Sequence, residues 1–386
     1  MRVALAYPEV GDTTSLGRET LMIANALIDR GSEVHIYQRP SPARPGLVQH
    51  AVGEPTASGR SARVGQAVDA WRWARAANHA LAGDRTAYDV VCAVGTAGWV
   101  HDLVRVHAVI RAEQQRWPVR GGREFRAARP RAALAPMLRP QIAVERTIQR
   151  LQFRPGRFVR ALAVTDEVAH DLVEQFGADP SRIDVVPCLI DYARFAAVPQ
   201  RSEALVNGDH AFVFIGNDFE RKGLSIAIRA LTDLPSNVHL IVVGGDDPAP
   251  FRKLATELNV GSRVAFEGAS PAPERFYLGA TALVSPSAED VWGMALIEAM
   301  AAGVPVISSS SAGAASLVAD SQAGIVLDEL SPRALARAIE QIVDDPAQAA
   351  QMGADGRRAA ADFHHATVRR LVEAFEAPRA ATQTRT

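Results

Sequence analysis

The chain has 386 residues, of which 48% are apolar and 22% charged, and its formal net charge is −1. This composition is typical of a soluble globular protein with room for two ordinary domains, and it excludes a disordered chain. Two widely separated cysteines, Cys92 and Cys188, exclude a cysteine cluster and favour a reducing cytoplasm. No run reaches the roughly 20 apolar residues of a membrane span, and the first residues predict a strand rather than a signal peptide.

The N-terminal pattern is that of a doubly wound α/β domain. Residues 3–7 predict a strand, 8–15 a loop with Gly and Thr, and 17–30 an amphipathic helix. Ligands of such domains bind beyond the strand ends. The loop has no Gly-x-Gly-x-x-Gly, so we reject a dinucleotide site. Glu19 could face a ligand, but stabilisation of the helix dipole is its expected role.

A basic stretch follows. Strands are predicted at 88–94, 104–109, 161–164 and 183–187, and residues 105–160 hold 14 Arg against three Glu, a formal balance of +11. Aromatic residues are sparse there and no nucleic-acid motif is present, so RNA and DNA are discounted as partners. Two interpretations stay open, a surface for an anionic acceptor or membrane and an ordinary solvated basic face.

In the second half, a predicted strand at 211–215 leads into the loop 216–223 and then into a helix. The loop carries two adjacent cations, Arg221 and Lys222. Cations in a loop that enters a helix suit a diphosphate, because the side chains and the unpaired amides attract the same charge. Two exposed surface cations are the alternative.

A second strand–loop–helix unit covers residues 281–308. The helix is expected from about Gly293, with Gly303 as its stop and Pro305 beyond. Asp290 precedes the helix, and Glu298 lies five residues into it, roughly 7 Å along the axis. A ligand over the helix start could meet both carboxylates. For an isolated acidic pair, however, solvated helix charges are the more common explanation.

This stretch resembles the donor-site signature of glycosyltransferase family 4. The resemblance lies in two acids with seven residues between them, a Gly three after the first, and then Glu-Ala-Met-Ala-x-Gly-x-Pro-Val. The loop 216–223 is similar to that of lipopolysaccharide-core α-glucosyltransferases. The resemblance covers nearly the whole chain and is strongest from 212 to 342. It implies an α/β GT-B fold, with two Rossmann-like doubly wound domains facing each other across a cleft, and a retaining reaction.

The family's functional residues can be placed on this sequence one by one. Glu298 would bind the donor ribose, and His107 would lie near the reacting sugar carbon, with His101 as its rival. The resemblance also implies that the donor diphosphate is bound by Gly216, Arg221 and Lys222. The transferred sugar would be contacted by Asp290, which would also be a catalytic residue, and by the amides at Trp292, Gly293 and Met294. The N-terminal loop, with Ser15 and Gly17, would approach both substrates.

The chain departs from the family pattern at four places. Asp290 stands where the family usually has Glu, and Asn217 where it has Arg. Thr14-Ser15 replaces a Gly-Gly pair, and Cys188-Leu189-Ile190 replaces Asn-Gly-Val. These departures bear on donor choice and on the turns around the site.

We therefore expect an acceptor-binding domain at 1–195, a nucleotide-sugar domain at 209–364, and a helix with a frayed tail at 365–386 that returns to the first domain. The expected reaction is retaining hexosyl transfer from an NDP-sugar, UDP-linked by resemblance, without a metal or other cofactor. An anionic glycolipid is one candidate acceptor, and a cytoplasmic location with peripheral contact at the inner membrane face is expected. The alternatives are an NDP-N-acetylhexosamine 2-epimerase on the same fold, and a non-catalytic binder of sugar nucleotides or polyanions.

Overall fold

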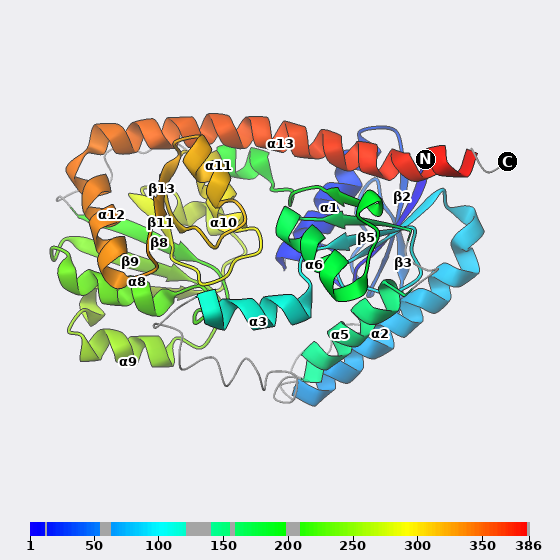
Figure 1. The fold of residues 1–386 in the computed structure, drawn as a ribbon, viewed down its shortest axis with the longest axis horizontal. Coiled ribbons are helices and arrows are strands. Elements are labelled where there is room, and N and C mark those ends of the chain that lie inside the picture. The colour runs from blue at the N-terminus through cyan, green and yellow to red at the C-terminus, as the bar shows by residue number, and fades with distance from the viewer. Residues whose placement is uncertain (12–13, 55–62, 121–139, 155–158, 198–208, 384–386) are drawn as a thin grey trace. The chain divides into compact units, whose positions relative to one another are not determined.

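The computed structural model describes all residues except 12–13, 55–62, 121–139, 155–158, 198–208 and 384–386. The chain forms two compact units (Figure 1). Unit 1 comprises Met1–Gln115, Pro130–Leu189 and Ala366–Thr386, and unit 2 comprises Arg116–Arg129 and Ile190–His365. The chain passes from unit 1 to unit 2 at Ile190, which is earlier than the expected boundary at 195. The reason is that Ile190 and Phe195 are buried in the core of unit 2.

The part of unit 1 that the structure describes is built on a seven-stranded parallel sheet in the order β3-β2-β1-β4-β5-β6-β7. Its strands are β1 (Arg2–Ala6), β2 (Glu33–Gln38), β3 (Val48–Ala51), β4 (Val90–Val94), β5 (Leu103–Val106), β6 (Arg160–Ala163) and β7 (Ile183–Val185). Its helices are α1 (Ser15–Ile28), α2 (Arg63–Asp84), α3 (Ile110–Arg120, which runs on into unit 2), α5 (Pro140–Gln152) and α6 (Asp166–Phe176). The strand order reverses between β1 and β4, which is the topological switch point of this sheet.

Unit 2 holds a six-stranded parallel sheet, again counted over the described residues, in the order β10-β9-β8-β11-β12-β13. Its strands are β8 (His210–Ile215), β9 (Val238–Val243), β10 (Val264–Gly268), β11 (Ala282–Ser285), β12 (Val306–Ser309) and β13 (Gly324–Leu327). Its helices are α7 (Tyr192–Ala196), α8 (Leu224–Ala230), α9 (Ala249–Glu257), α10 (Met294–Ala302), α11 (Ala315–Asp320) and α12 (Pro332–Asp344). The switch point lies between β8 and β11, which pair in parallel.

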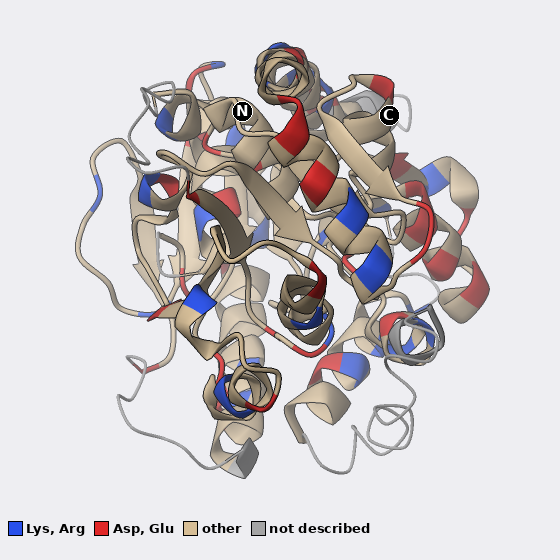
Figure 2. Cartoon of the chain, turned by 90° about the vertical axis from the view of Figure 1, so that its left-hand side faces the viewer, with Lys and Arg blue, Asp and Glu red and all other residues tan. Residues whose placement is uncertain are grey.

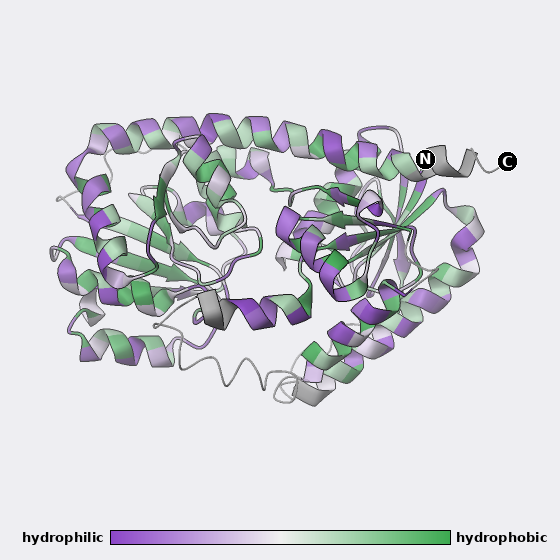
Figure 3. Ribbon diagram, in the orientation of Figure 1, coloured by the Kyte–Doolittle hydropathy of each residue, from purple (hydrophilic) through white to green (hydrophobic). Residues whose placement is uncertain are grey.

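Apolar strands explain why both sheets lie inside their units. The strands are predominantly green in Figure 3, whereas the helices alternate between green and purple. In unit 2 the strands are almost entirely tan in Figure 2, because only β10 contains a charged residue, Glu267. Parallel strands covered on both faces are expected to be mostly apolar, and in unit 2 the strands other than β10 contain no Lys, Arg, Asp or Glu.

The last helix, α13 (Pro346–Gln383), contributes to both units. Its Ala360 is buried in a core cluster of unit 2, and its Leu371 and Phe375 are buried in the core of unit 1. The predicted frayed tail from Glu376 is wrong as far as Gln383, because the helix continues to that residue. The predicted linker at 196–208 lies largely outside the described residues.

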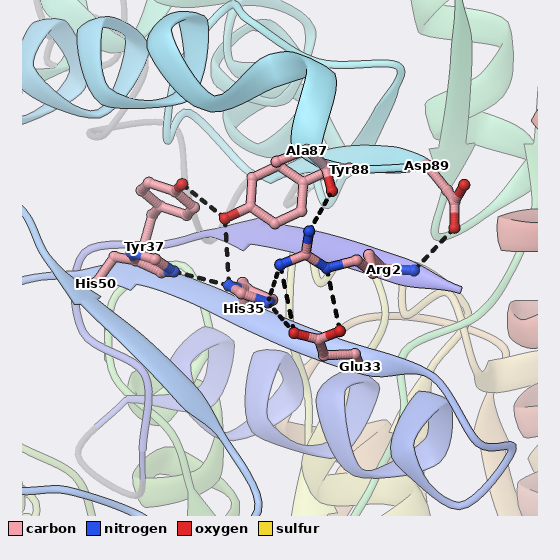
Figure 4. A network of polar contacts seen from close by, with 8 residues as sticks. All are labelled: Arg2, Glu33, His35, Tyr37, His50, Ala87, Tyr88 and Asp89. Carbon is pink, nitrogen blue, oxygen red and sulfur yellow. Dashed lines mark hydrogen bonds and ion pairs between the residues drawn. The ribbon is translucent and has the colours of Figure 1, made fainter.

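A polar network ties the first three strands of unit 1 together (Figure 4). Arg2 Nε lies 3.1 Å from Glu33 Oε2, and His35 Nε2 lies 2.8 Å from Glu33 Oε1. On its other side, His35 Nδ1 lies 2.8 Å from His50 Nε2 and 3.2 Å from the Tyr88 hydroxyl. Burial and the neighbouring His35 lower the pKa of His50. The network fixes the short strand β3 on its neighbour β2.

Candidate functional site

The switch point of unit 2 brings the two predicted donor-site loops together. One loop leaves the carboxyl end of β8 at Gly216, and the other leaves the carboxyl end of the adjacent strand β11 at Pro286. The loops are joined by a hydrogen bond from the Ala288 amide to the Arg221 carbonyl, 2.9 Å long. In open α/β sheets the crevice at this position is where ligands bind. The topology alone therefore places residues 216–223 beside residues 286–293.

Both predicted cations are held by acceptors of unit 2 rather than by solvent. The Lys222 ammonium forms an ion pair with the Asp290 carboxylate, and these side chains are 15% and 12% exposed. Arg221 donates from Nε to Asp218 Oδ2 at 2.9 Å and from Nη1 to the Glu289 carbonyl at 2.6 Å. The alternative of two solvated surface cations is wrong. Among the described residues, Asp290 is the hydrogen-bond partner that the Lys222 ammonium, a group with three N–H bonds, has.

Gly216, the third predicted diphosphate residue, packs under the Lys222 side chain. A Cβ atom built on Gly216 would lie 3.4 Å from Lys222 Cε. That is an ordinary contact distance, so packing against the lysine stem does not require glycine, whereas the φ of Gly216, 153°, favours it. Its amide donates to the Val243 carbonyl at 2.9 Å, so this amide already has an acceptor.

Backbone pairing fixes the loop that carries Asp290. The Asp290 amide donates to the Ser311 carbonyl at 3.3 Å, and the Asp290 carbonyl accepts from the Gly313 amide at 2.9 Å. Two residues later, the Trp292 carbonyl accepts from the Ala314 amide at 2.8 Å. The indole of Trp292 stacks on Phe363, with ring centroids 5.4 Å apart. Trp292 is therefore positioned by packing, while Asp290 is positioned by the backbone on both sides of it.

Gly293 turns the chain into α10. It has a φ of 86°, a left-handed conformation that glycine adopts without steric cost. Within the described residues no side chain caps the helix, so the amides of Met294 and Ala295 lack a capping side chain and an acceptor within the helix, whereas the Leu296 amide donates to the Gly293 carbonyl at 2.9 Å. Together with the positive end of the helix dipole, such amides attract oxygen atoms and anions.

Glu298 and Asp290 are buried, at 7% and 9% exposure. The more common explanation for such a pair, solvated helix charges, is therefore wrong. The Tyr277 hydroxyl lies 3.4 Å from Glu298 Oε2 and 3.2 Å from the Ala295 carbonyl. Burial and the nearby Glu298 raise the pKa of Tyr277 well above its ordinary value, so the hydroxyl stays protonated and can donate. Tyr277 was not singled out from the sequence.

In unit 1, His107 follows directly after β5 and forms part of a buried charged group. His107 Nε2 contacts Glu19 Oε2, and Arg105 Nη2 donates to Glu19 Oε1 at 2.7 Å. Arg105 also donates to the carbonyls of Val186 and Pro187. Glu19 and Arg105 are 2% and 0% exposed. The expected role of Glu19 as a helix-dipole acid is thus wrong, because its buried carboxylate pairs with Arg105 and His107 instead.

The electrostatics of this group favour an ionised carboxylate. Burial alone would raise the pKa of Glu19, but Arg105 and His107 outweigh it and hold the pKa far below the ordinary range. Because Glu19 accepts at His107 Nε2, that nitrogen carries the proton. The other ring nitrogen, Nδ1, is buried and has no hydrogen-bond partner among the described residues. His107 is thus held in one orientation, with 18% of its side chain exposed.

The rival histidine, His101, lies in the loop between β4 and β5. It is 7% exposed, and neither ring nitrogen has a partner in the part of the chain that the structure describes. Burial lowers its pKa to about 4. His101 is therefore a neutral buried side chain, whereas His107 is the histidine that a carboxylate orients.

The predicted N-terminal loop residues lie in a helix. Ser15 and Gly17 belong to the first turn of α1, where Thr14 accepts a hydrogen bond from the Gly17 amide at 3.0 Å. A Cβ atom on Gly17 would clash with the Glu9 carbonyl oxygen. Gly17 allows the loop to pack against the helix, and Ser15 is exposed.

Glu19, His107 and Cys188 present potential metal ligand atoms within 4.8 Å of one another. The Glu19 oxygens, however, already accept from Arg105, His107 and the Leu189 amide, the last at 3.3 Å. A metal ion would have to displace these bonds and lie beside the Arg105 charge. The donor set therefore fits a hydrogen-bond network better than a metal site.

Comparison with known proteins gives a consistent result. Residues 199–359 match the family model described as glycosyl transferases group 1. A D-inositol 3-phosphate glycosyltransferase of Thermomonospora curvata is 28% identical over 96% of this chain and 92% of its own length. The lipopolysaccharide glucosyltransferase WaaG of Escherichia coli K12 is 30% identical over 47% of this chain and 52% of its own length.

Solved structures show the fold. The crystal structure of WaaG has a TM-score of 0.70 at 20% identity, covering 94% of this chain and 95% of its own. Anabaena Alr3699/HepE, solved in complex with UDP-glucose, has a TM-score of 0.69 at 15% identity and covers both chains fully (100% of each). The two Rossmann-like units therefore have the GT-B fold, as the resemblance implied. No helix within the described ranges is long and apolar enough to cross a membrane.

Proposed function

We propose that this chain, a glycosyltransferase whose residues 199–359 match the glycosyl transferases group 1 family, moves a hexosyl group from a UDP-sugar to an acceptor hydroxyl with retention. The observation that carries the proposal is the arrangement at the switch point of unit 2. There, a buried Asp290 pairs with Lys222 of the adjacent loop, and α10, which follows Asp290, has an uncapped start and carries the buried Glu298. The proposed acceptor is a glycan, a glycolipid or a natural product.

Each group of unit 2 has a role in this proposal. The Glu298 carboxylate accepts hydrogen bonds from the ribose hydroxyls of the nucleotide. Lys222 and Arg221 bind the diphosphate and stabilise the charge that develops as it leaves, which is an electrostatic contribution to catalysis. Because these cations and the helix amides supply the positive potential, we propose that the reaction needs no metal ion. Asp290 holds Lys222 in place and contacts the transferred sugar with the amides at Trp292, Gly293 and Met294.

The bond changes follow a same-face route. The acceptor oxygen attacks the anomeric carbon, the bond from that carbon to the diphosphate oxygen breaks, and the acceptor proton passes to the departing phosphate. His107 of unit 1 contacts the donor sugar, and Glu19 fixes its orientation.

Donor binding tests the proposal. UDP-, GDP- and dTDP-sugars are titrated into the protein by calorimetry, with and without EDTA, for the unmodified chain, Glu298→Ala and the control Glu340→Ala. Glu340 is an exposed acid on α12. Selective, EDTA-resistant binding of one donor that is lost only in Glu298→Ala supports the donor site. Equal binding by both variants, or no binding of any donor, overturns it.

Turnover separates the proposed transfer from the alternatives. Proton NMR of the product reports the anomeric configuration, and an inverted configuration contradicts retention. Conversion of UDP-N-acetylhexosamine to its 2-epimer without an acceptor supports the epimerase instead. Binding of a donor without turnover against a panel of acceptors supports a non-catalytic binder.

The identity of the acceptor and the location of the protein are part of the same proposal. We place the anionic acceptor, and any contact with the inner face of the membrane, on the basic region 105–160 of a cytoplasmic protein. Much of that region lies outside the described residues. Fractionation of cells that express the protein tests the location, and recovery wholly outside the cytoplasm and its membrane contradicts it.

A further inference from the structure

One residue of the loop between β11 and α10 carries a charged side chain that has no role in the site described above. Glu289 directly precedes Asp290 and is completely buried, with 0% of the residue exposed. Its Oε1 atom accepts a hydrogen bond from Nε of Arg116 at 3.2 Å, and the Arg116 side chain is 19% exposed. Removing a carboxylate from water costs a large desolvation energy, and a paired arginine helps to offset it.

Arg116 comes from a distant part of the sequence. It lies on α3, which begins at Ile110 in unit 1, and the stretch Arg116–Arg129 belongs to unit 2. The start of α3 is held within unit 1, because the Gln149 side chain accepts from the Ile110 amide at 3.2 Å. The helix thus supplies unit 2 with a cation that stands 173 positions before Glu289.

The backbone of Glu289 connects this ion pair to the residues proposed to act on the diphosphate. The Glu289 carbonyl accepts from Arg221 Nη1 at 2.6 Å. The same peptide plane contains the Asp290 amide, which donates to the Ser311 carbonyl at 3.3 Å. Because a peptide unit is planar and rigid, the orientation of this one plane sets both bonds together.

The Glu289 side chain is a further constraint on the orientation of that plane. The residue before it is also held, since the Ala288 amide donates to the Arg221 carbonyl at 2.9 Å. Without Arg116, the Glu289 carboxylate would turn toward water or other donors, and the backbone that carries it would turn as well. Arg221 would then lose its carbonyl acceptor, and Asp290 would move with the shared peptide plane.

Stability alone does not account for a buried ion pair at this position. Replacing such a pair with apolar side chains of similar volume is often neutral or stabilising. What the pair adds is a defined orientation, because a hydrogen bond between charged groups weakens when its distance or angle changes. Here the oriented element is the loop that carries Asp290.

We propose that Arg116 is a positioning residue of the donor site. It acts through Glu289, whose peptide plane keeps Arg221 and Asp290 in place for the donor diphosphate. This role depends on the proposed function for the identity of the ligand. Loss of Arg116 should weaken binding of the diphosphate but not of the nucleoside, because Glu298, the proposed ribose ligand, lies on α10 beyond the loop.

The first experiment compares two ligands that differ only in the diphosphate. UDP is titrated into the full chain by calorimetry, and uridine by ligand-observed NMR, for the unmodified chain, Arg116→Gln and the control Arg229→Gln. Arg229 is an exposed arginine on α8 of the same unit. Arg116→Gln should bind UDP at least about tenfold more weakly, because charge-assisted hydrogen bonds to the diphosphate are disturbed, and should bind uridine normally. Arg229→Gln should bind both ligands normally.

Two outcomes of these titrations overturn the positioning role. One is unchanged UDP affinity in Arg116→Gln, and the other is an equal loss of UDP and uridine affinity, which indicates general damage to unit 2. If Arg116→Gln does not fold, the same comparison is made with Arg116→Lys, which keeps a charge beside the carboxylate but displaces it, and UDP alone should again bind more weakly.

A double-mutant cycle shows whether Arg116 acts through Glu289. If it does, Arg116→Gln/Glu289→Gln should bind UDP no more weakly than the weaker of the two single variants. Losses of affinity that multiply in the double variant contradict the pathway through Glu289.

Hydrogen exchange separates the positioning role from the donor site itself. Without any ligand, mass spectrometry should show the amides of residues 287–291 exchanging at least about tenfold faster in Arg116→Gln than in the unmodified chain or in Arg229→Gln, because the loop opens more readily. Faster exchange in a protein that binds no UDP means that the donor site fails while Arg116 still positions the loop. Normal UDP binding and normal exchange in Arg116→Gln mean that the donor site stands and the positioning role is wrong.

Discussion

Gly223→Ala should disturb the donor site through the backbone alone. Gly223 precedes α8, has a φ of 78°, and lies against the loop that follows β11. A Cβ atom built on it would lie 2.9 Å from the Pro286 carbonyl carbon and closer still to its oxygen. Because real Cβ atoms essentially never come within 3.0 Å of a neighbour, the two loops must separate. Lys222, the residue before Gly223, would then shift relative to Asp290.

The cost has two components. A left-handed conformation costs a residue with a Cβ roughly 1–2 kcal/mol, and the steric overlap with rigid backbone costs about 1–3 kcal/mol more. Gly279 provides a matched control in the same unit, because its φ is 76° and a Cβ atom on it meets nothing within 4 Å. Gly279→Ala should therefore show only the first component, about 1–2 kcal/mol.

Two assays report on these effects. Urea unfolding followed by circular dichroism gives the free energy of unfolding, which should fall further in Gly223→Ala than in Gly279→Ala. Calorimetric titration with UDP should show affinity weakened at least about tenfold in Gly223→Ala, because the loops that carry Lys222 and Asp290 no longer meet. Gly279→Ala should bind UDP normally. Equal UDP affinity in the two variants would refute the argument that close loop contact builds the site.

Three further predictions concern unit 1. The pKa of His101 is about 4 when folded against about 6.5 when unfolded, so the unfolded chain takes up the proton first as the pH falls. Stability should decrease by about 2 kcal/mol between pH 7 and pH 5, and urea unfolding should show this loss abolished in His101→Phe but kept in His79→Gln. Glu19→Gln leaves the Arg105 charge buried without a carboxylate and should lower the free energy of unfolding of unit 1 by about 3–5 kcal/mol. The double variant Glu19→Gln/Arg105→Met should recover stability relative to Glu19→Gln, and additive losses from the two substitutions would contradict this pairing. Burial raises the pKa of Cys92 to about 12, so Cys92 should resist alkylation at pH 8 until urea unfolds the chain, and rapid native labelling at that position by mass spectrometry would contradict the structure.

Features set by local chemistry were predictable from the sequence. The helix stop at Gly303 is an example, because a residue with a φ of 75° directly after α10 calls for glycine, and Pro305 prevents the helix from continuing. The alternation of apolar strands and amphipathic helices likewise predicted two parallel sheets. The loops of the donor site followed from this alternation, since each comes directly after a strand.

Pairings between distant segments were not predictable. The Lys222–Asp290 pair joins residues 68 positions apart, and the Arg105–Glu19 pair joins residues 86 apart. Local propensity carries no information about such contacts. A signal for the second pair was nevertheless present, because Glu19 precedes the buried Ile23 by four residues and so lies on the buried face of α1. Arg105 stands inside the apolar strand β5, where a charge requires a partner.

The path of the chain through α13 affects the order in which the protein can be completed on the ribosome. Residues 190–365, which form nearly all of unit 2, are synthesised before Leu371 and Phe375 exist, and those two side chains belong to the core of unit 1. Although unit 1 contains the N-terminus, it is the second unit to acquire a full core. At that stage a nascent chain would contain nearly all the residues of unit 2, whereas the N-terminal sheet of unit 1 would still expose apolar side chains that Leu371 and Phe375 cover later. Those side chains are covered only when the end of α13 arrives, which makes the stretch from Ala366 to Phe375 the closing step of folding.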